Sequence, residues 1–157
     1  MEYKTNVMRL LDRLKIPYIG HSYAGTGAVS GEEVARALGE DPARTFKTLV
    51  TVGKSKQYYV FLVPVARELD LKKAAACAGE KSVSMIKSKE LLPVTGYIHG
   101  GCSPVGMKKP FPTFIDSSAL LFDTIIFSAG KIGYQVETSL TELKRAVPFS
   151  VADLTVV

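Results

Sequence analysis

Apolar positions recur along this chain with both helical and strand periods, which predicts interspersed helices and strands. The segments 45–52 and 57–63 are rich in β-branched and aromatic residues, and the polar turn 53–56 between them predicts a β-hairpin. Between Thr5 and Lys15, apolar residues return at the spacing of one helical face. These residues are Val7, Leu10, Leu11 and Leu14.

Capping residues predict where other helices begin and end. The stretch Ser30-Gly31-Glu32-Glu33 has the spacing of a capping box, and Gly39 stands where a C-terminal glycine ends a helix. Asp70 is expected to cap a helix over 71–78, and Ser139 is expected to cap a last helix near the end of the chain.

The order of the elements predicts an α+β fold. Pro93 is expected to stop a helical turn over 88–92. With about six or seven strands and three or four helices in no strict βαβ order, we expect a mixed, barrel-like β-sheet surrounded by helices. The chain has 157 residues without repeats or linkers, so we expect residues 1–157 to form a single domain. Further short strands are expected at 18–23, 82–86, 113–115, 124–128 and 134–138.

Composition narrows the class of protein. With 46% hydrophobic and 22% charged residues, the sequence is typical of a globular protein. No run approaches the about 18 apolar residues that span a membrane. The start, Met1–Lys15, carries charges throughout and lacks the apolar block of a signal peptide. Two cysteines build no disulfide framework, so we expect a cytoplasmic protein with no membrane partner.

The charge balance favours a partner that carries phosphates. The chain has 20 Lys and Arg against 15 Asp and Glu, which gives a net charge of +5. Clustered positive charge lowers the cost of approaching a polyanion. The excess is too small for a protein that coats DNA, so DNA is not an expected partner. Ordinary solubility is the alternative interpretation of the charge.

Motifs of several common chemistries are absent from the sequence. His21, His99, Cys77 and Cys102 have no spacing that a zinc site would use. There is no G-x-S-x-G elbow, and the glycine loop at 100–106 lacks the order of a dinucleotide-binding or Walker motif. We therefore expect neither a metal nor a cofactor.

Cys102 and Lys47 each have two interpretations. Cys102 lies in a glycine loop beside His99, where a lowered pKa would make its thiol a nucleophile, but a packed side chain is the favoured interpretation. Lys47 lies in an otherwise apolar strand and shares a face with Leu49. Its side chain is either solvated or directed into a cleft, where an ammonium group binds phosphate or polarises an ester carbonyl.

Two loops offer backbone groups to a ligand. Glycines in the loop 100–106 allow close approach of a ligand and positive φ. The segment 128–131 (SAGK), at the end of another predicted strand, likewise contains a glycine. Lys108 and Lys109 follow the first loop at once. They form either a basic rim for phosphates or an ordinary solvated pair.

Four segments in this order resemble the YbaK-type aminoacyl-tRNA deacylases, which are relatives of the editing insertion of bacterial prolyl-tRNA synthetase. The resemblance covers nearly the whole chain and implies a mixed sheet curled toward a barrel. A free-standing protein of this type removes cysteine from Cys-tRNA(Pro), with Cys-tRNA(Cys) as a further substrate. The segments are 46–49 (FKTL), 69–75 (LDLKKAA), 95–109 (TGYIHGGCSPVGMKK, the most specific) and 128–131 (SAGK).

The resemblance also implies the site residues. Lys47 matches the family's essential lysine, which anchors the 3′-terminal nucleotide or polarises the ester. Lys108 and Lys109 are implied to contact tRNA. The implied partners are the acceptor end of aminoacyl-tRNA and, as a further candidate, prolyl-tRNA synthetase. The matching substrate-binding positions are Tyr23, Thr48, Gly100, Gly101, Ser103, Ser128 and Gly130.

The mechanism proposed for the family needs no nucleophile from the protein. The substrate's own cysteine thiol attacks the ester carbonyl, which gives a cyclic thiolactone and frees the tRNA. Well-oriented intramolecular reactions gain about 7–11 kcal/mol from proximity. Editing is needed because a difference of one methylene gives only about 1–3 kcal/mol of discrimination, and cysteine is close to proline in size.

Several departures from the family pattern leave alternatives open. Ala129 replaces a glycine, Gln135 stands where some relatives carry an acid, Cys102 replaces an aliphatic residue, and the segment 24–29 is unlike that of its relatives. One alternative is a deacylase of other acyl specificity, such as one for Ala-tRNA. Another is a non-catalytic module that binds the acceptor end of tRNA or a synthetase.

Overall fold

The computed structural model describes residues 3–157, which form two β-sheets, five α-helices and one 3₁₀ helix. The predicted α+β class is confirmed. No helix in this described part is long and apolar enough to cross a membrane. The helices are α1 (Asn6–Arg13), α2 (Gly31–Leu38), α3 (Leu71–Ala78), α4 (Ser88–Thr95), η1 (Ser117–Leu121) and α5 (Leu140–Ala146).

The larger sheet has the strand order β4-β2-β3-β5-β8, and the smaller has the order β1-β7-β6. β2 pairs antiparallel with β3 and β4, whereas β5 pairs parallel with β3 and β8. The smaller sheet is antiparallel throughout. The strands are β1 (Ile19–Ser22), β2 (Phe46–Gly53), β3 (Tyr58–Pro64), β4 (Val83–Met85), β5 (Thr113–Asp116), β6 (Ile125–Ser128), β7 (Tyr134–Thr138) and β8 (Ser150–Ala152).

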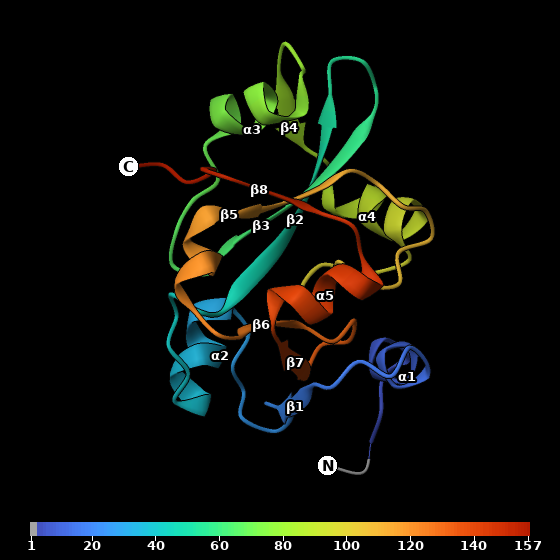
Figure 1. The fold of residues 1–157 in the computed structure, drawn as a ribbon, viewed down its shortest axis with the longest axis vertical. Helices are drawn as coiled ribbons and strands as arrows, with labels where there is room; N and C mark the ends of the chain where they lie inside the picture. The colour runs from blue at the N-terminus through green and yellow to red at the C-terminus, as the bar shows by residue number, and fades with distance from the viewer. Residues whose placement is uncertain (1–2) are drawn as a thin grey trace.

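The predicted barrel-like sheet is corrected by the structure, because the two sheets do not close into a barrel. A single parallel bridge between Thr45 and Ile126 links them, and the Ile126 N–H donates to the Arg44 carbonyl oxygen at 3.0 Å. Thr45 is the last residue before β2, so this segment pairs with β6 at one residue before it enters the larger sheet as β2. Figure 1 shows β1, β7 and α1 at one end of the molecule, with α3 and the β2–β3 hairpin at the other.

The main hydrophobic core lies between the two sheets. Side chains alternate along a strand, so β2 sends Phe46 and Val50 into this core while Leu49 packs on the opposite face, toward α3. The smaller sheet contributes Phe127 and Val136 from its inner face. Residues 46–50 of β2 therefore lie where the two sheets meet, next to the cavity described below.

Most predicted helix ends are confirmed. Thr5 caps α1 and accepts a hydrogen bond from the Met8 N–H at 3.2 Å. Ser30 and Glu33 form the predicted capping box of α2, which ends at Gly39 with φ 69°. These caps satisfy N–H groups that a helix otherwise leaves without partners.

The prediction that Pro93 stops a helix was wrong, since α4 continues through it to Thr95. Proline removes one helical hydrogen bond, and in this short helix the loss is confined to one position. Leu91 and Thr95 are buried, and the Thr95 hydroxyl donates to the Leu91 carbonyl at 2.7 Å. Burial of this face holds the last turn. The sequence prediction also omitted η1 and β8.

Candidate active site

A cavity of about 650 Å³ opens along the edge of β2. β4 pairs with β2 only at Thr51–Gly53, so the stretch from Phe46 to Val50 has β3 on one side and the cavity on the other. The remaining walls come from Tyr23, the start of α2, the β4–α4 connection, the glycine loop and the facing strands of the smaller sheet. The cavity therefore occupies the gap where the two sheets part.

The hydrogen-bonding register decides which backbone groups of β2 face the cavity. The Val65 N–H donates to the Thr45 oxygen, so the odd-numbered residues of β2 direct their backbone groups toward β3. Even-numbered residues direct theirs to the opposite edge, and the Val50 oxygen accepts from the Ile86 N–H at 3.2 Å. Thr48 lies two residues earlier, beyond the reach of β4. Its N–H and C=O therefore point to the open edge.

The side chain of Thr48 also lacks a partner. Its Oγ1 is buried and makes no hydrogen bond within residues 3–157. A buried hydroxyl left unpaired costs about 1–3 kcal/mol, and nearly all buried polar groups are paired. Because Thr48 also lines the cavity, this hydroxyl is a candidate to bond a ligand there.

Lys47 reaches the same cavity from the other face of the sheet. Its Nζ lies 3.9 Å from Oε1 of Glu68, whose side chain is 85% exposed. An ion pair this long and this exposed contributes little to the stability of the fold. The ammonium group of Lys47 can therefore exchange Glu68 for an anionic or polarised oxygen of a ligand.

Ser128 and Gln135 face each other across β6 and β7. The Ser128 Oγ accepts from the Gly130 N–H at 3.1 Å, which leaves its own proton free to donate into the cavity. Gln135 is only 6% exposed and its amide lies beside the Glu40 carboxylate, so we assign the orientation in which its nitrogen donates to Oε2 at 2.7 Å. That orientation leaves the amide oxygen of Gln135 as an acceptor for a ligand.

A polar network beneath this pair fixes the start of β2 against the smaller sheet. The Glu137 carboxylate contacts His21 Nε2 at 2.8 Å and accepts from Arg44 at 2.8 Å and from the Thr124 hydroxyl at 2.5 Å. Burial by itself would raise the pKa of Glu137. The hydrogen bonds from Thr124 and His21 and the charge of Arg44 outweigh it, so the pKa is lowered. The network thus ties the residue before Thr45 to β7.

The glycine loop forms another wall. Gly100 has φ +89°, a left-handed conformation that favours glycine, and it lines the cavity. Gly101 packs so closely on the 128–134 loop that a Cβ there would lie 3.2 Å from the Ile132 nitrogen. Ser103 is fully buried and accepts from the Val105 N–H at 3.3 Å. Gly101 and Ser103 therefore support the loop and do not line the cavity.

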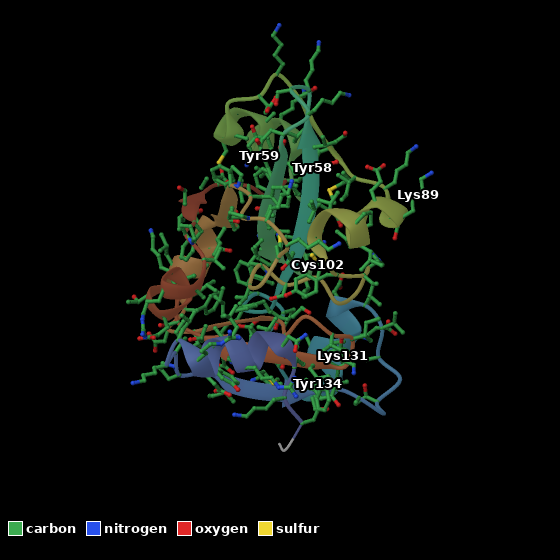
Figure 2. The ribbon with its side chains drawn as sticks, turned by 90° about the vertical axis from the view of Figure 1, so that its right-hand side faces the viewer. Tyr58, Tyr59, Lys89, Cys102, Lys131 and Tyr134 are labelled. Atoms are coloured by element: carbon green, nitrogen blue, oxygen red, sulfur yellow. The ribbon has the colours of Figure 1, made fainter. Side chains whose placement is uncertain are left out.

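Cys102 lies in the cavity wall as a packed side chain (Figure 2). It is 8% exposed, and burial raises the pKa of its thiol to about 12. The reactive form of cysteine is the thiolate. The thiol therefore stays protonated at neutral pH, which favours the packed interpretation over a nucleophile.

The structure brings together five of the residues that the sequence nominated, namely Tyr23, Lys47, Thr48, Gly100 and Ser128. Gly130 lines a second, smaller cavity beside Lys131. The stem of Lys108 lies against Gly96 at that second cavity, and Lys109 is exposed.

Sequence reasoning assigned no role to Gln135 or Tyr134, which also line the main cavity. The available signal was strand alternation, which puts Gln135 on one face with its cross-strand partner Ser128. Among residues 3–157 no group of three or more His, Cys, Asp or Glu side chains is placed to hold a metal ion.

Comparison with known proteins decides the family. The model of the aminoacyl-tRNA editing domain matches residues 26–146. The chain belongs to this family. An Enterococcus faecalis protein named "Putative Cys-tRNA(Pro)/Cys-tRNA(Cys) deacylase EbsC" is 47% identical to this editing domain over 137 residues, which are 87% of this chain and 84% of that protein.

Three further similarities concern a synthetase and two solved structures. A proline–tRNA ligase of Thermosipho melanesiensis is 37% identical over 76 residues, or 48% of this chain and 13% of the ligase. A crystal structure described as "a putative trans-editing enzyme for prolyl tRNA synthetase" has a TM-score of 0.85 and 25% identity, and the match covers 99% of this editing domain and 100% of that chain. The protein APE2540, at 22% identity and a TM-score of 0.87, shares the fold, with 97% of this chain and all of that chain covered.

Proposed function

We propose that this protein is a free-standing aminoacyl-tRNA deacylase that removes cysteine from mischarged Cys-tRNA(Pro), with Cys-tRNA(Cys) as a second substrate. Membership of the editing-domain family and the 47% identity to a protein named for these two substrates support the proposal. The editing unit acts in trans in the cytoplasm. A prolyl-tRNA synthetase that charges the same tRNA is the candidate partner, since part of such a ligase is similar to this chain.

One observation carries the chemistry: the cavity has donors but no activated thiol of its own. Lys47, Thr48 and Ser128 offer an ammonium group and two hydroxyls, whereas burial raises the pKa of the Cys102 thiol to about 12. Such a site is suited to hold an ester and to stabilise charge that develops on its oxygen. In the mechanism that the family resemblance implies, the nucleophile comes with the substrate.

The cavity residues suit the substrate-assisted reaction that the family resemblance implies. The substrate's thiol loses its proton and its sulfur attacks the ester carbonyl carbon, so a C–S bond forms while negative charge develops on the carbonyl oxygen. Lys47 and the hydroxyls of Thr48 and Ser128 stabilise this oxygen. The C–O bond to the ribose then breaks, the ribose oxygen takes up a proton, and cysteine leaves as a thiolactone. Holding sulfur and carbonyl together supplies about 7–11 kcal/mol of the barrier reduction.

A panel of mischarged tRNAs tests the proposal. Purified protein is incubated with Cys-tRNA(Pro), Ala-tRNA(Pro), Ser-tRNA(Pro) and Pro-tRNA(Pro), and the remaining aminoacyl ester is measured over time. We expect rapid loss of the cysteinyl ester and stable prolyl, alanyl and seryl esters. Loss of the alanyl ester at the same rate would replace cysteine specificity by a broader acyl specificity. Salt-sensitive tRNA binding without any deacylation would make the protein a binding module.

A further inference from the structure

A second cavity of about 300 Å³ lies on the far side of the loop that carries Ser128. Its walls are residues 3–7 and 9 at the start of the chain, Gly96 and Tyr97, and Ala129 to Lys131. The 128–134 loop is shared, because Ser128 and Tyr134 line the first cavity while Gly130 and Lys131 line the second. Figure 2 shows Lys131 and Tyr134 together beside α1. We call the second cavity the lysine groove.

Positive charge gathers around the lysine groove. Lys4, Arg9 and Lys131 line it. Lys4 is paired with Asp12 at 2.6 Å. Arg9 and Lys131 form no salt bridge with a carboxylate in the part of the chain that the structure describes. Two lining cations are therefore available to an anion.

An aromatic surface connects the groove with the active-site cavity. The rings of Tyr3 and Tyr134 pack with centroids 4.8 Å apart and an angle of 32° between their planes. Lys131 Nζ lies 4.9 Å from the centroid of the Tyr3 ring and donates to the Tyr3 hydroxyl at 2.9 Å. Tyr3 lines the groove, and Tyr134 lines the active-site cavity.

We propose that the lysine groove binds the single-stranded nucleotides that precede the terminal adenosine of the tRNA. This inference rests on the proposed function, because the esterified ribose must occupy the first cavity. Proteins bind single-stranded nucleic acid by combining a basic groove that follows the phosphates with aromatic rings on which bases stack. Arg9 and Lys131 bind the phosphates, and Tyr3 offers its ring to a base. The RNA chain passes over the 128–134 loop from one cavity to the other.

Truncated substrates test this inference. The kcat/KM for deacylation is measured with cysteinyl-adenosine, which ends at the first cavity, and with a cysteinyl minihelix that carries the complete single-stranded 3′ end. The variants are Lys131→Met, Arg9→Gln and Tyr3→Ala. The control is Lys54→Met, since Lys54 is exposed in the β2–β3 hairpin, at the end of the molecule opposite α1 (Figure 1).

We expect each groove variant to lower kcat/KM for the minihelix about fivefold at low salt, with a much smaller loss for cysteinyl-adenosine. Removing one phosphate contact also makes the slope of log kcat/KM against log salt shallower by about 0.7. Lys54→Met leaves both substrates unaffected. Equal losses on the two substrates, or no loss on the minihelix, would overturn the inference.

Direct binding separates this inference from the proposed function. A fluorescently labelled RNA tetranucleotide with a CCA end, without any amino acid, is titrated with wild-type protein and with the double variant Arg9→Gln/Lys131→Met. We expect about twenty-five-fold weaker binding by the double variant, as the product of two fivefold losses. Unchanged binding would refute the groove even if the enzyme deacylates Cys-tRNA(Pro). Weakened binding alongside an inactive wild-type protein would refute the proposed function alone.

Discussion

The two halves of β2 differ in the strands that pair with them. Residues 51–53 pair with both β3 and β4, whereas residues 46–50, which we call the open half, pair with β3 alone. Thr51 lies in the half that β3 and β4 flank on both sides; it is 0% exposed, and its hydroxyl donates to the Tyr59 oxygen at 3.2 Å. Thr48 lies in the half with β3 alone, and its buried hydroxyl has no partner in residues 3–157. The absence of a second neighbouring strand makes this half of an ordinary β-strand one wall of the cavity.

The same contrast explains how a strand edge can be left open without exposing the molecule to edge-to-edge aggregation. Unpaired strand edges invite pairing with other chains, and proteins protect them with charge or with covering elements. Here Lys47 places a charge on the open half, and α2 and the β4–α4 connection form the opposite walls of the cavity. The edge is accessible to a small ligand, whereas another strand would be excluded.

The largest effect is expected from Lys47→Ala in the open half. Removing a group that stabilises the developing oxyanion lowers rates by about 10²–10³, so kcat for Cys-tRNA(Pro) should fall at least about a hundredfold. The ion pair with Glu68 is long and exposed, so thermal unfolding should change little. A folded variant with wild-type kcat would remove Lys47 from the mechanism.

Glu137→Gln tests the polar network that holds the start of β2 against the smaller sheet. The pKa of Glu137 is lower in the folded chain than in the unfolded chain. Its charge therefore stabilises the fold above the unfolded pKa of about 4.3, and the contribution is lost as pH falls through the folded pKa. Hydrogen bonds to a charged group contribute about 1.5–3 kcal/mol, so we expect a loss of about 2 kcal/mol at pH 7.

Urea denaturation at pH 7 and pH 4 measures this effect. Wild-type protein should lose more stability between the two pH values than the Gln variant does, because the variant has no carboxylate to protonate at position 137. Equal pH dependence in the two proteins would show that the Glu137 network contributes nothing to folding.

Two matched substitutions, one in each half of β2, test the two halves separately. Thr51→Val removes a hydrogen bond and should cost about 1 kcal/mol of stability with little effect on activity. Thr48→Val removes a hydroxyl that has no partner in the described protein, so stability should not fall, whereas kcat/KM should drop about tenfold if the hydroxyl bonds the substrate. A stability loss in Thr48→Val together with an activity loss in Thr51→Val would contradict this comparison.

The smallest effect is expected from Cys102→Ala. Burial raises the pKa of this thiol to about 12, so it supplies no thiolate near neutral pH. Activity should stay within about threefold of wild type, with a modest stability loss from the removed sulfur. A dead but folded variant would make Cys102 the nucleophile.

Local sequence signals predicted the elements well and their assembly less well. The capping residues Ser30, Asp70 and Ser139 act as the sequence indicated, because a cap depends on residues only a few positions away. Pro93 misled because burial of Leu91 and Thr95 outweighs one lost hydrogen bond. The separation into two sheets depends on long-range pairing that periodicity does not encode.

The sequence predicted only those site residues that belong to recognisable motifs. Lys47, Thr48, Gly100 and Ser128 come together as the family resemblance implied. The orphaned hydroxyl of Thr48 depends on where β4 stops pairing, and the Glu40–Gln135 contact depends on how α2 packs on the smaller sheet. Neither follows from the residue types.

In the proposed reaction the attacking sulfur belongs to the substrate, so blocking that sulfur is the decisive experiment. Deacylation of Cys-tRNA(Pro) is compared with that of the same tRNA carrying S-methylcysteine, under identical conditions and with the small product identified by mass. We expect a thiolactone from the first substrate and no cleavage of the second beyond the uncatalysed rate. Equal rates for the two esters would contradict it.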